Sequence, residues 1–112
     1  MAEPAVFSRI RDVVQDNDVV LFMKGVNGAP QCGFSQQVML ILNHLGVEFK
    51  DVNVLADQDI REGIKAFSDW PTIPQLYVKG EFVGGCDIIR EMYEAGELTG
   101  FLADKGVALA VA

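Results

Sequence analysis

The chain has 112 residues, half of them hydrophobic, and a formal net charge of −7. This length fits a single domain, residues 1–112, with enough apolar residues for a core. The acidic balance argues against a broad nucleic-acid surface and against an anionic membrane surface as partners, because both attract basic proteins.

No apolar run approaches the roughly 20 residues that a membrane helix requires. The first residues include Glu3 and Pro4 and lack a basic, hydrophobic leader. The two cysteines, Cys32 and Cys86, are fewer than a disulfide-stapled secreted domain normally has. We therefore expect a cytoplasmic protein with free thiols, with a processed organellar form as the alternative.

The start of the chain predicts a helix, a strand and a loop. Apolar residues recur at helical spacing over residues 4–15, which indicates an amphipathic helix. The continuous apolar run 19–23 is typical of a strand buried on both faces. The stretch 24–31 contains glycines and a proline and predicts a loop.

The middle of the chain predicts two helices on either side of a strand. The dense apolar segment 38–45 ends at Gly46 and predicts a mostly buried helix. Residues 47–54 alternate imperfectly and predict a strand. Asp57 or Asp59 is placed to cap the next helix. The apolar face of that helix carries Ile60, Ile64 and Phe67.

The second half begins with residues 70–74, which cannot be helical because each proline restricts the residue before it. Two short strands, 75–78 and 81–83, flank Lys79-Gly80, a two-residue hairpin signal. A helix over 86–95 follows.

A last short helix near 98–102 and an apolar tail from about Gly106 complete the chain. The first strand, helix and second strand form a βαβ unit, whose parallel strands need a right-handed crossover. The hairpin and its following helix complete an α/β domain. The sequence thus predicts a thioredoxin-like fold, with one mixed four-stranded sheet and helices on both faces.

Cys32 lies between the predicted loop and the N-terminal end of a helix. Free N–H groups and the helix dipole favour a thiolate there, and such thiols have pKa values of about 3.5–7.5, against roughly 8.5 for a free thiol. Lys24 adds positive charge. The alternative is an inert, buried cysteine. Ser35 stands where a Cys-x-x-Cys pair would have its second thiol, so Cys32 must react with an external thiol or coordinate a metal.

The run Cys32-Gly33-Phe34-Ser35, preceded by Lys24-Gly25 and Pro30, resembles the monothiol glutaredoxins of the CGFS type. The segments 70–76 and 83–87 match further motifs of that family, and the similarity extends from about residue 6 to residue 102. The resemblance implies a glutaredoxin fold and a glutathione-ligated 2Fe-2S cluster that bridges two subunits. It also implies a homodimer when the cluster is bound, with BolA-like proteins and apo iron–sulfur acceptor proteins as partners.

Glutathione has two carboxylates and an ammonium group, and the sequence offers candidates for each. Arg61 and Lys65 are neighbours on one helix face and, with Lys24, are candidates to bind the glycine carboxylate. From spacing alone, a solvated helix face screened by Glu62 is the stronger interpretation. The family pattern, which this chain matches at Lys24 and Arg61, favours the carboxylate site.

The remaining candidates follow from the later motifs. Thr72-Ile73-Pro74 resembles the cis-proline segment of the thioredoxin family, whose backbone would pair with an extended tripeptide; an ordinary loop proline is the alternative. Gly85, Cys86 and Asp87 open a helix whose N–H groups suit the γ-glutamyl carboxylate, with Asp87 for the ammonium group. As alternatives, Asp87 is a first-turn acid favoured by the dipole, and Cys86 is a small buried residue.

Aromatic residues near these motifs receive different interpretations. Phe34 is a candidate apolar wall of the glutathione site. Trp70 is interpreted as a packing residue, and His44 as a surface or capping residue.

Two functions from different classes follow. In the first, Cys32 and glutathione hold a 2Fe-2S cluster for transfer to other proteins. In the second, the Cys32 thiolate reduces mixed disulfides between proteins and glutathione, with Cys86 as a possible resolving thiol. The long loop before the cysteine is associated in the CGFS type with weak activity of this second kind, so cluster transfer ranks first. A pure protein-binding adaptor is a third option, which leaves the activated thiol unexplained.

Overall fold

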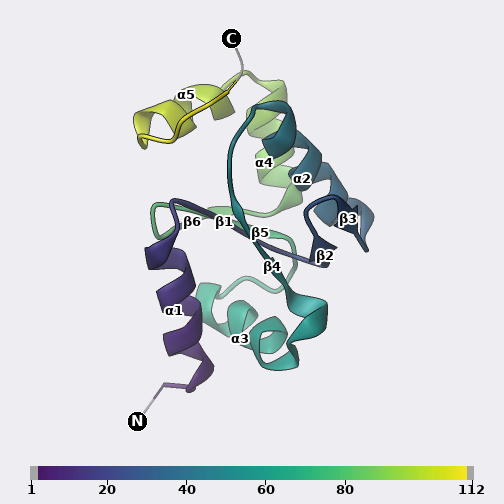
Figure 1. Cartoon of the computed structure of the whole chain (residues 1–112), viewed down its shortest axis with the longest axis vertical. Helices are drawn as coiled ribbons and strands as arrows, with labels where there is room; N and C mark the ends of the chain where they lie inside the picture. The colour runs from purple at the N-terminus through teal and green to yellow at the C-terminus, as the bar shows by residue number, and fades with distance from the viewer. Residues whose placement is uncertain (1–2, 111–112) are drawn as a thin grey trace.

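One mixed sheet organises the chain in the computed structural model, which describes residues 3–110. Its strand order is β4-β1-β5-β6 (Figure 1). The central strand β1 (Val19–Met23) runs parallel to β4 (Lys50–Asn53) and antiparallel to β5 (Gln75–Val78). The edge strand β6 (Glu81–Gly84) pairs antiparallel with β5. The predicted thioredoxin-like fold is therefore confirmed.

Helices cover both faces of this sheet. Figure 1 shows α1 (Val6–Asp16) and α3 (Gln58–Ser68) on one side. It shows α2 (Gly33–His44), α4 (Cys86–Glu94) and α5 (Leu98–Asp104) on the other. A helix therefore begins at each of the two thiols, because Cys32 occupies the N-cap position of α2 and Cys86 is the first residue of α4.

The core consists of two clusters separated by the sheet. All five residues of β1 are buried, and they alternate between the two sides. Leu21 and Met23 face the cluster beneath α2, α4 and α5, whereas Val20 and Phe22 face the cluster beneath α1 and α3. This explains why the strand reads as a continuous apolar run instead of an alternating one.

The helix α3 begins where its sequence predicts. The Asp57 carboxylate accepts a hydrogen bond from the Ile60 N–H at 3.2 Å, so Asp57 and not Asp59 is the cap. A short 3₁₀ turn, η1 (Val54–Ala56), leads into it. The capped start fixes the helix that carries the predicted basic residues.

The second predicted strand, 47–54, is shorter in the structure, where β4 spans only Lys50–Asn53. Val47 is buried, but its N–H donates to the Leu42 carbonyl at 3.0 Å, so Val47 completes the end of α2. At the other end, the Asn53 side chain accepts from the Leu55 N–H and turns the chain. Both ends of the apolar stretch are thus used by helix termini.

The predicted loop 24–31 contains a small hairpin, β2 (Gly25–Val26) and β3 (Ala29–Pro30). Side chains from other elements hold it. The Asn27 N–H donates to Asp51 Oδ2 at 2.7 Å, and Asn43 Nδ2 donates to Asn27 Oδ1 at 2.8 Å. The segment that delivers the chain to Cys32 is therefore anchored to both β4 and α2.

The apolar tail packs against the domain as far as it is described. Val107 is buried in the core, and the Ala110 N–H donates to the Gly46 carbonyl at 3.3 Å. The last two residues of the predicted tail lie outside the described residues. None of the helices in residues 3–110 is long and apolar enough to cross a membrane.

Candidate functional site

Cys32 is the N-cap of α2 and is partly exposed. The pKa of the Cys32 thiol is lowered below its ordinary value. Burial raises this pKa, but it is outweighed by the backbone N–H groups of Ser35 and Phe34, by the positive charge of Lys24 and by the Ser35 hydroxyl. The thiol makes no capping hydrogen bond to the helix. The lowered pKa therefore comes from the first turn of α2 together with the nearby charge of Lys24.

Ser35 explains why the fourth motif position suits a hydroxyl. Its side chain is completely buried, and its Oγ accepts the backbone N–H of Lys24 at 3.0 Å. This bond joins the end of β1 to the first turn of α2. Ser35 therefore holds Lys24 and Cys32 in a fixed relation while leaving Cys32 without a second thiol in its motif.

Cys86 behaves differently from Cys32. It is buried, and its Sγ–H donates to Gln37 Oε1 at 3.2 Å. Burial is the main cause that raises the pKa of this thiol. Cys86 is thus a small buried residue with a protonated thiol, and Cys32 is the activated thiol of the chain.

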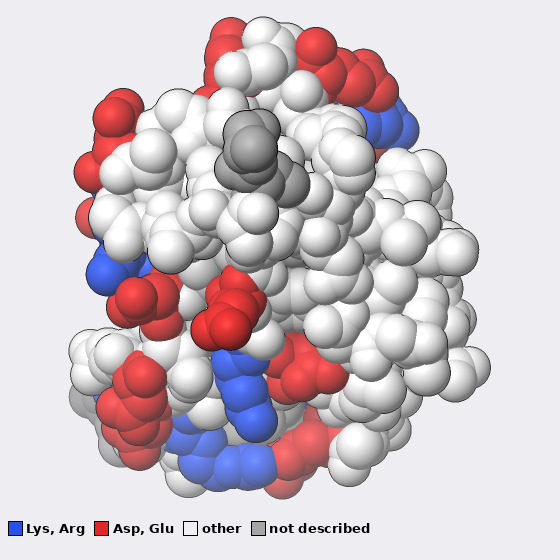
Figure 2. Space-filling view, turned by 45° about the horizontal axis from the view of Figure 1, so that its top comes forward, with Lys and Arg blue, Asp and Glu red and all other residues white. Residues whose placement is uncertain are grey.

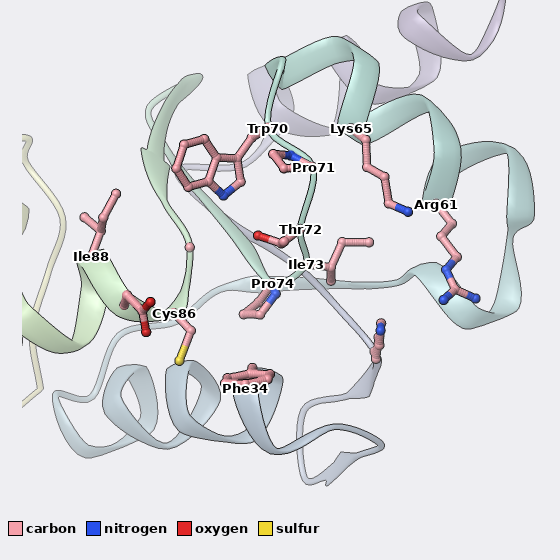
Figure 3. Close-up of a pocket in the computed structure, with 13 residues that line it drawn as sticks. Phe34, Arg61, Lys65, Trp70, Pro71, Thr72, Ile73, Pro74, Cys86 and Ile88 are labelled. Atoms are coloured by element: carbon pink, nitrogen blue, oxygen red, sulfur yellow. The ribbon is translucent and has the colours of Figure 1, made fainter.

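A cavity of about 400 Å³ lies beside Cys32, between α2, α3 and α4. All ten residues that the sequence predicts for glutathione line it: Lys24, Phe34, Arg61, Lys65, Thr72, Ile73, Pro74, Gly85, Cys86 and Asp87. Figure 3 shows Arg61 and Lys65 reaching from α3 on one side, Phe34 on α2 at another, and the 72–74 segment between them. The structure therefore brings together residues that are spread over much of the sequence.

One end of the cavity is cationic. Lys24, Arg61 and Lys65 are all half-buried there. Lys65 forms an ion pair with Glu62 at 3.5 Å. Exposed pairs of this kind contribute little stability, so a ligand carboxylate can compete with Glu62 for Lys65.

The middle of the cavity is formed by the segment before β5. The Ile73–Pro74 peptide bond is cis, as the resemblance implies. The fully buried Gln75 donates from Nε2 to the carbonyl oxygens of Trp70 and Thr72, each at 3.1 Å. Two hydrogen bonds from one side chain thus hold this wall.

The other end of the cavity is the start of α4. Gly85 is the N-cap and makes no side-chain bond, so the first N–H groups of α4 lack the partners that a helix interior gives. Asp87 is exposed and pairs with Arg90 at 3.5 Å. This end therefore offers backbone donors and one carboxylate.

Cys32 itself lines a neighbouring hollow of about 530 Å³ with Gln36, Gln37 and Leu40. Phe34 lines both this hollow and the cavity. The thiol therefore stands between the cavity and the outer surface of α2. This geometry suits a sulfur that has one partner in the cavity and another outside the chain.

Comparison with known proteins connects this site to a family. The Glutaredoxin family model matches residues 19–83. The Probable monothiol glutaredoxin 2 of Rickettsia conorii is 59% identical over 98 residues, which cover 88% of this chain and 92% of that protein. The chain belongs to the monothiol glutaredoxins. Its CGFS motif, single activated thiol and fold agree with this membership.

Solved structures support the same fold. A monomeric truncated mutant of Trypanosoma brucei 1-C-Grx1 has a TM-score of 0.86 and 42% identity, covering 98% of this glutaredoxin and all of that chain. A buckwheat glutaredoxin–glutathione complex has a TM-score of 0.78 at 24% identity, with 96% and 93% coverage. At that identity the second likeness concerns the fold alone.

The sequence interpretation missed three residues that line the cavity: Trp70, Pro71 and Ile88. Trp70 does pack against Phe82, with ring centroids 6.0 Å apart, but the residue is 38% exposed. The only sequence signal for Trp70 as a cavity residue was an aromatic side chain directly before the proline-containing segment 71–74. His44 is exposed at the end of α2, as predicted, and its ring lies 6.0 Å from that of Tyr93.

Proposed function

We propose that this monothiol glutaredoxin binds glutathione in the cavity and, with Cys32, carries a 2Fe-2S cluster between two copies of the chain for transfer to apo iron–sulfur proteins. The observation that carries the proposal is a single thiol of lowered pKa beside a cavity that is cationic at one end and donor-rich at the other.

Glutathione matches this cavity group by group. Its glycine carboxylate suits Lys24, Arg61 and Lys65, since charge-assisted bonds to carboxylates are the stronger kind. Its peptide backbone suits the extended segment at Ile73, in the manner of an added strand. Its γ-glutamyl carboxylate suits the start of α4, and its ammonium group suits Asp87. In this orientation the cysteine of glutathione is held near Cys32.

The cluster requirement follows from a count of thiolates. Within residues 3–110, no group of three or more His, Cys, Asp or Glu is arranged to hold a metal ion. A 2Fe-2S cluster normally takes four thiolates. Cys86 is protonated and bonded to Gln37, so each chain supplies Cys32 and a bound glutathione supplies a second sulfur. Two such half-sites complete the four.

The surface around Cys32 suits close approach of another protein. Residues 25–47 contain no Asp, Glu, Lys or Arg, and Figure 2 shows a broad uncharged area on the side where Figure 1 places α2 and β3. Phe34, Leu40 and Val26 are 60%, 51% and 42% exposed there. Two chains of net charge −7 repel each other overall. A neutral face at the thiol lowers that repulsion where a homodimer, a BolA-like protein or an acceptor would meet it.

The test is reconstitution with iron, sulfide and glutathione, followed by visible absorbance. We expect colour with the native chain, none with Cys32→Ser, and colour retained by the matched control Cys86→Ser. Colour without glutathione, or colour in Cys32→Ser, would contradict the proposed ligands.

A second candidate function rests on the same lowered pKa of Cys32. The thiolate would attack the glutathione sulfur of a protein mixed disulfide and release the protein thiolate. The thiolate of a second glutathione would then attack the glutathione sulfur that is bonded to Cys32. This attack regenerates the Cys32 thiolate and releases glutathione disulfide. The raised pKa of Cys86 disfavours it as a resolving thiol. Fast turnover of a glutathionylated peptide with no cluster formation would favour this function.

A further inference from the structure

We propose that Trp70 is a specificity residue for glutathione, whose indole N–H donates a hydrogen bond to the α-carboxylate of the γ-glutamyl group. This inference rests on the proposed glutathione site. It assigns a binding role to a residue whose sequence position predicts packing.

The hydrogen bonds of Trp70 leave its indole N–H for a ligand. Its backbone N–H donates to the Lys65 carbonyl at 3.1 Å and to Ser68 Oγ at 3.2 Å, and its carbonyl accepts from Gln75 Nε2. Among the described residues, the indole N–H has no bonded partner. A polar donor on a cavity wall is normally matched by solvent or by a ligand.

The indole is also fixed in place. The backbone carbonyl of Trp70 accepts a hydrogen bond from Gln75, and the indole ring packs against Phe82. Figure 3 shows the ring on the side of the cavity opposite Arg61 and Lys65, above the chain that leads to Cys86. The indole N–H therefore lies at the α4 end of the cavity, beside Gly85.

Gly85 brings the indole close to the helix start. A Cβ atom on Gly85 would lie 3.4 Å from Trp70 Nε1 and 3.2 Å from the Pro74 carbonyl oxygen. Glycine at this position keeps open the space between the indole and the first N–H groups of α4. A ligand oxygen in that space meets donors from two separate elements.

This donor set selects for a carboxylate. The two oxygens of a carboxylate accept several hydrogen bonds, so one can face the α4 amides and the other the indole. The neighbouring Asp87 carboxylate repels a second acid but attracts an ammonium group. An amino acid head group, with both charges on one carbon, is the ligand end that fits. Losing one hydrogen bond to a charged acceptor is expected to weaken binding about tenfold to a hundredfold.

The experiment compares two ligands on two forms of the chain. Trp70 is the only tryptophan, so growth with β-(3-benzothienyl)alanine replaces its N–H by sulfur with almost no change in shape. Calorimetry measures the affinity for glutathione and for γ-aminobutyryl-cysteinylglycine, which lacks the α-carboxylate. We expect the substituted chain to bind glutathione at least tenfold more weakly and the analogue within twofold of the native chain.

Two controls complete the test. Trp70→Phe, which also lacks the N–H, should give the same pattern. Tyr93→Phe, which removes a polar atom from an aromatic residue outside the cavity, should change neither affinity. An equal loss for both ligands, or unchanged glutathione affinity, would overturn the inference about Trp70. Failure of the native chain to bind glutathione at all would instead overturn the proposed function.

Discussion

Replacing Ser35 by alanine tests how the fourth motif position supports the thiol. The Ser35 hydroxyl is fully buried and accepts the Lys24 N–H at 3.0 Å. Alanine leaves that amide without its partner, and an unsatisfied buried donor costs about 1–3 kcal/mol. We expect Ser35→Ala to lower the free energy of unfolding by about 2 kcal/mol, which corresponds to a fall of roughly 10 °C in Tm for a domain of this size.

The same change acts on the thiol. The Ser35 hydroxyl and its backbone N–H both lower the pKa of Cys32, and alanine removes only the hydroxyl. The pKa of Cys32 should therefore rise while staying below the value of a free thiol. The rate of alkylation by iodoacetamide, followed against pH with the product located by mass spectrometry, measures this directly.

Ser8→Ala is the matched control, because Ser8 is exposed on α1 and far along the chain from the motif. We expect it to change stability by less than about 0.5 kcal/mol and to leave the alkylation profile unchanged. Equal stability of Ser35→Ala and the native chain would refute the anchoring role of the hydroxyl. An unchanged midpoint of alkylation would refute its role in ionising Cys32.

Further predictions concern the ligand end of the cavity, a helix cap and the core. Arg61→Gln should weaken glutathione binding about tenfold, whereas Arg11→Gln, outside the cavity, should not change it; calorimetry decides. The hydrogen bond from Arg9 is the main cause that lowers the pKa of Asp57. The ionised Asp57 therefore stabilises the folded chain fully at any pH above the pKa of the carboxyl in the unfolded chain, about 4. This stabilisation is lost as the pH falls through the lower pKa of Asp57 in the folded chain. Urea unfolding of Asp57→Asn should therefore show a deficit at pH 7 that shrinks below pH 4; a constant deficit would contradict this. Ile64→Ala should cost about 2–5 kcal/mol in the same assay, and a loss below 1 kcal/mol would contradict its full burial.

Local patterns predicted most of the fold because each element carries its own signal. The apolar run of β1, the Lys79-Gly80 turn and the Asp57 cap all depend on residues close together in sequence. The β2–β3 hairpin was missed because its two-residue strands have almost no signal of their own. Asp51 and Asn43, on other elements, hold it.

The candidate site likewise contains residues that the sequence predicts and one, Trp70, whose role depends on the folded structure. The position of Cys32 at a helix start could be predicted from local sequence, and the family motifs indicated ten residues that line the cavity. The aromatic character of Trp70 was a signal for the cavity, but its indole could not be placed from the sequence, because its position depends on contacts with residues that are distant along the chain. The hydrogen bond from Gln75 to the Trp70 carbonyl and the closeness of Gly85 to Trp70 Nε1 are visible only in the folded chain.

The central claim is that Cys32 and glutathione from two chains together hold one cluster. Native mass spectrometry of the reconstituted protein tests it most directly. We expect one coloured species whose mass equals two chains, two glutathione molecules and one 2Fe-2S cluster, and which is absent for Cys32→Ser. A cluster on a single chain, or on two chains without glutathione, would contradict it.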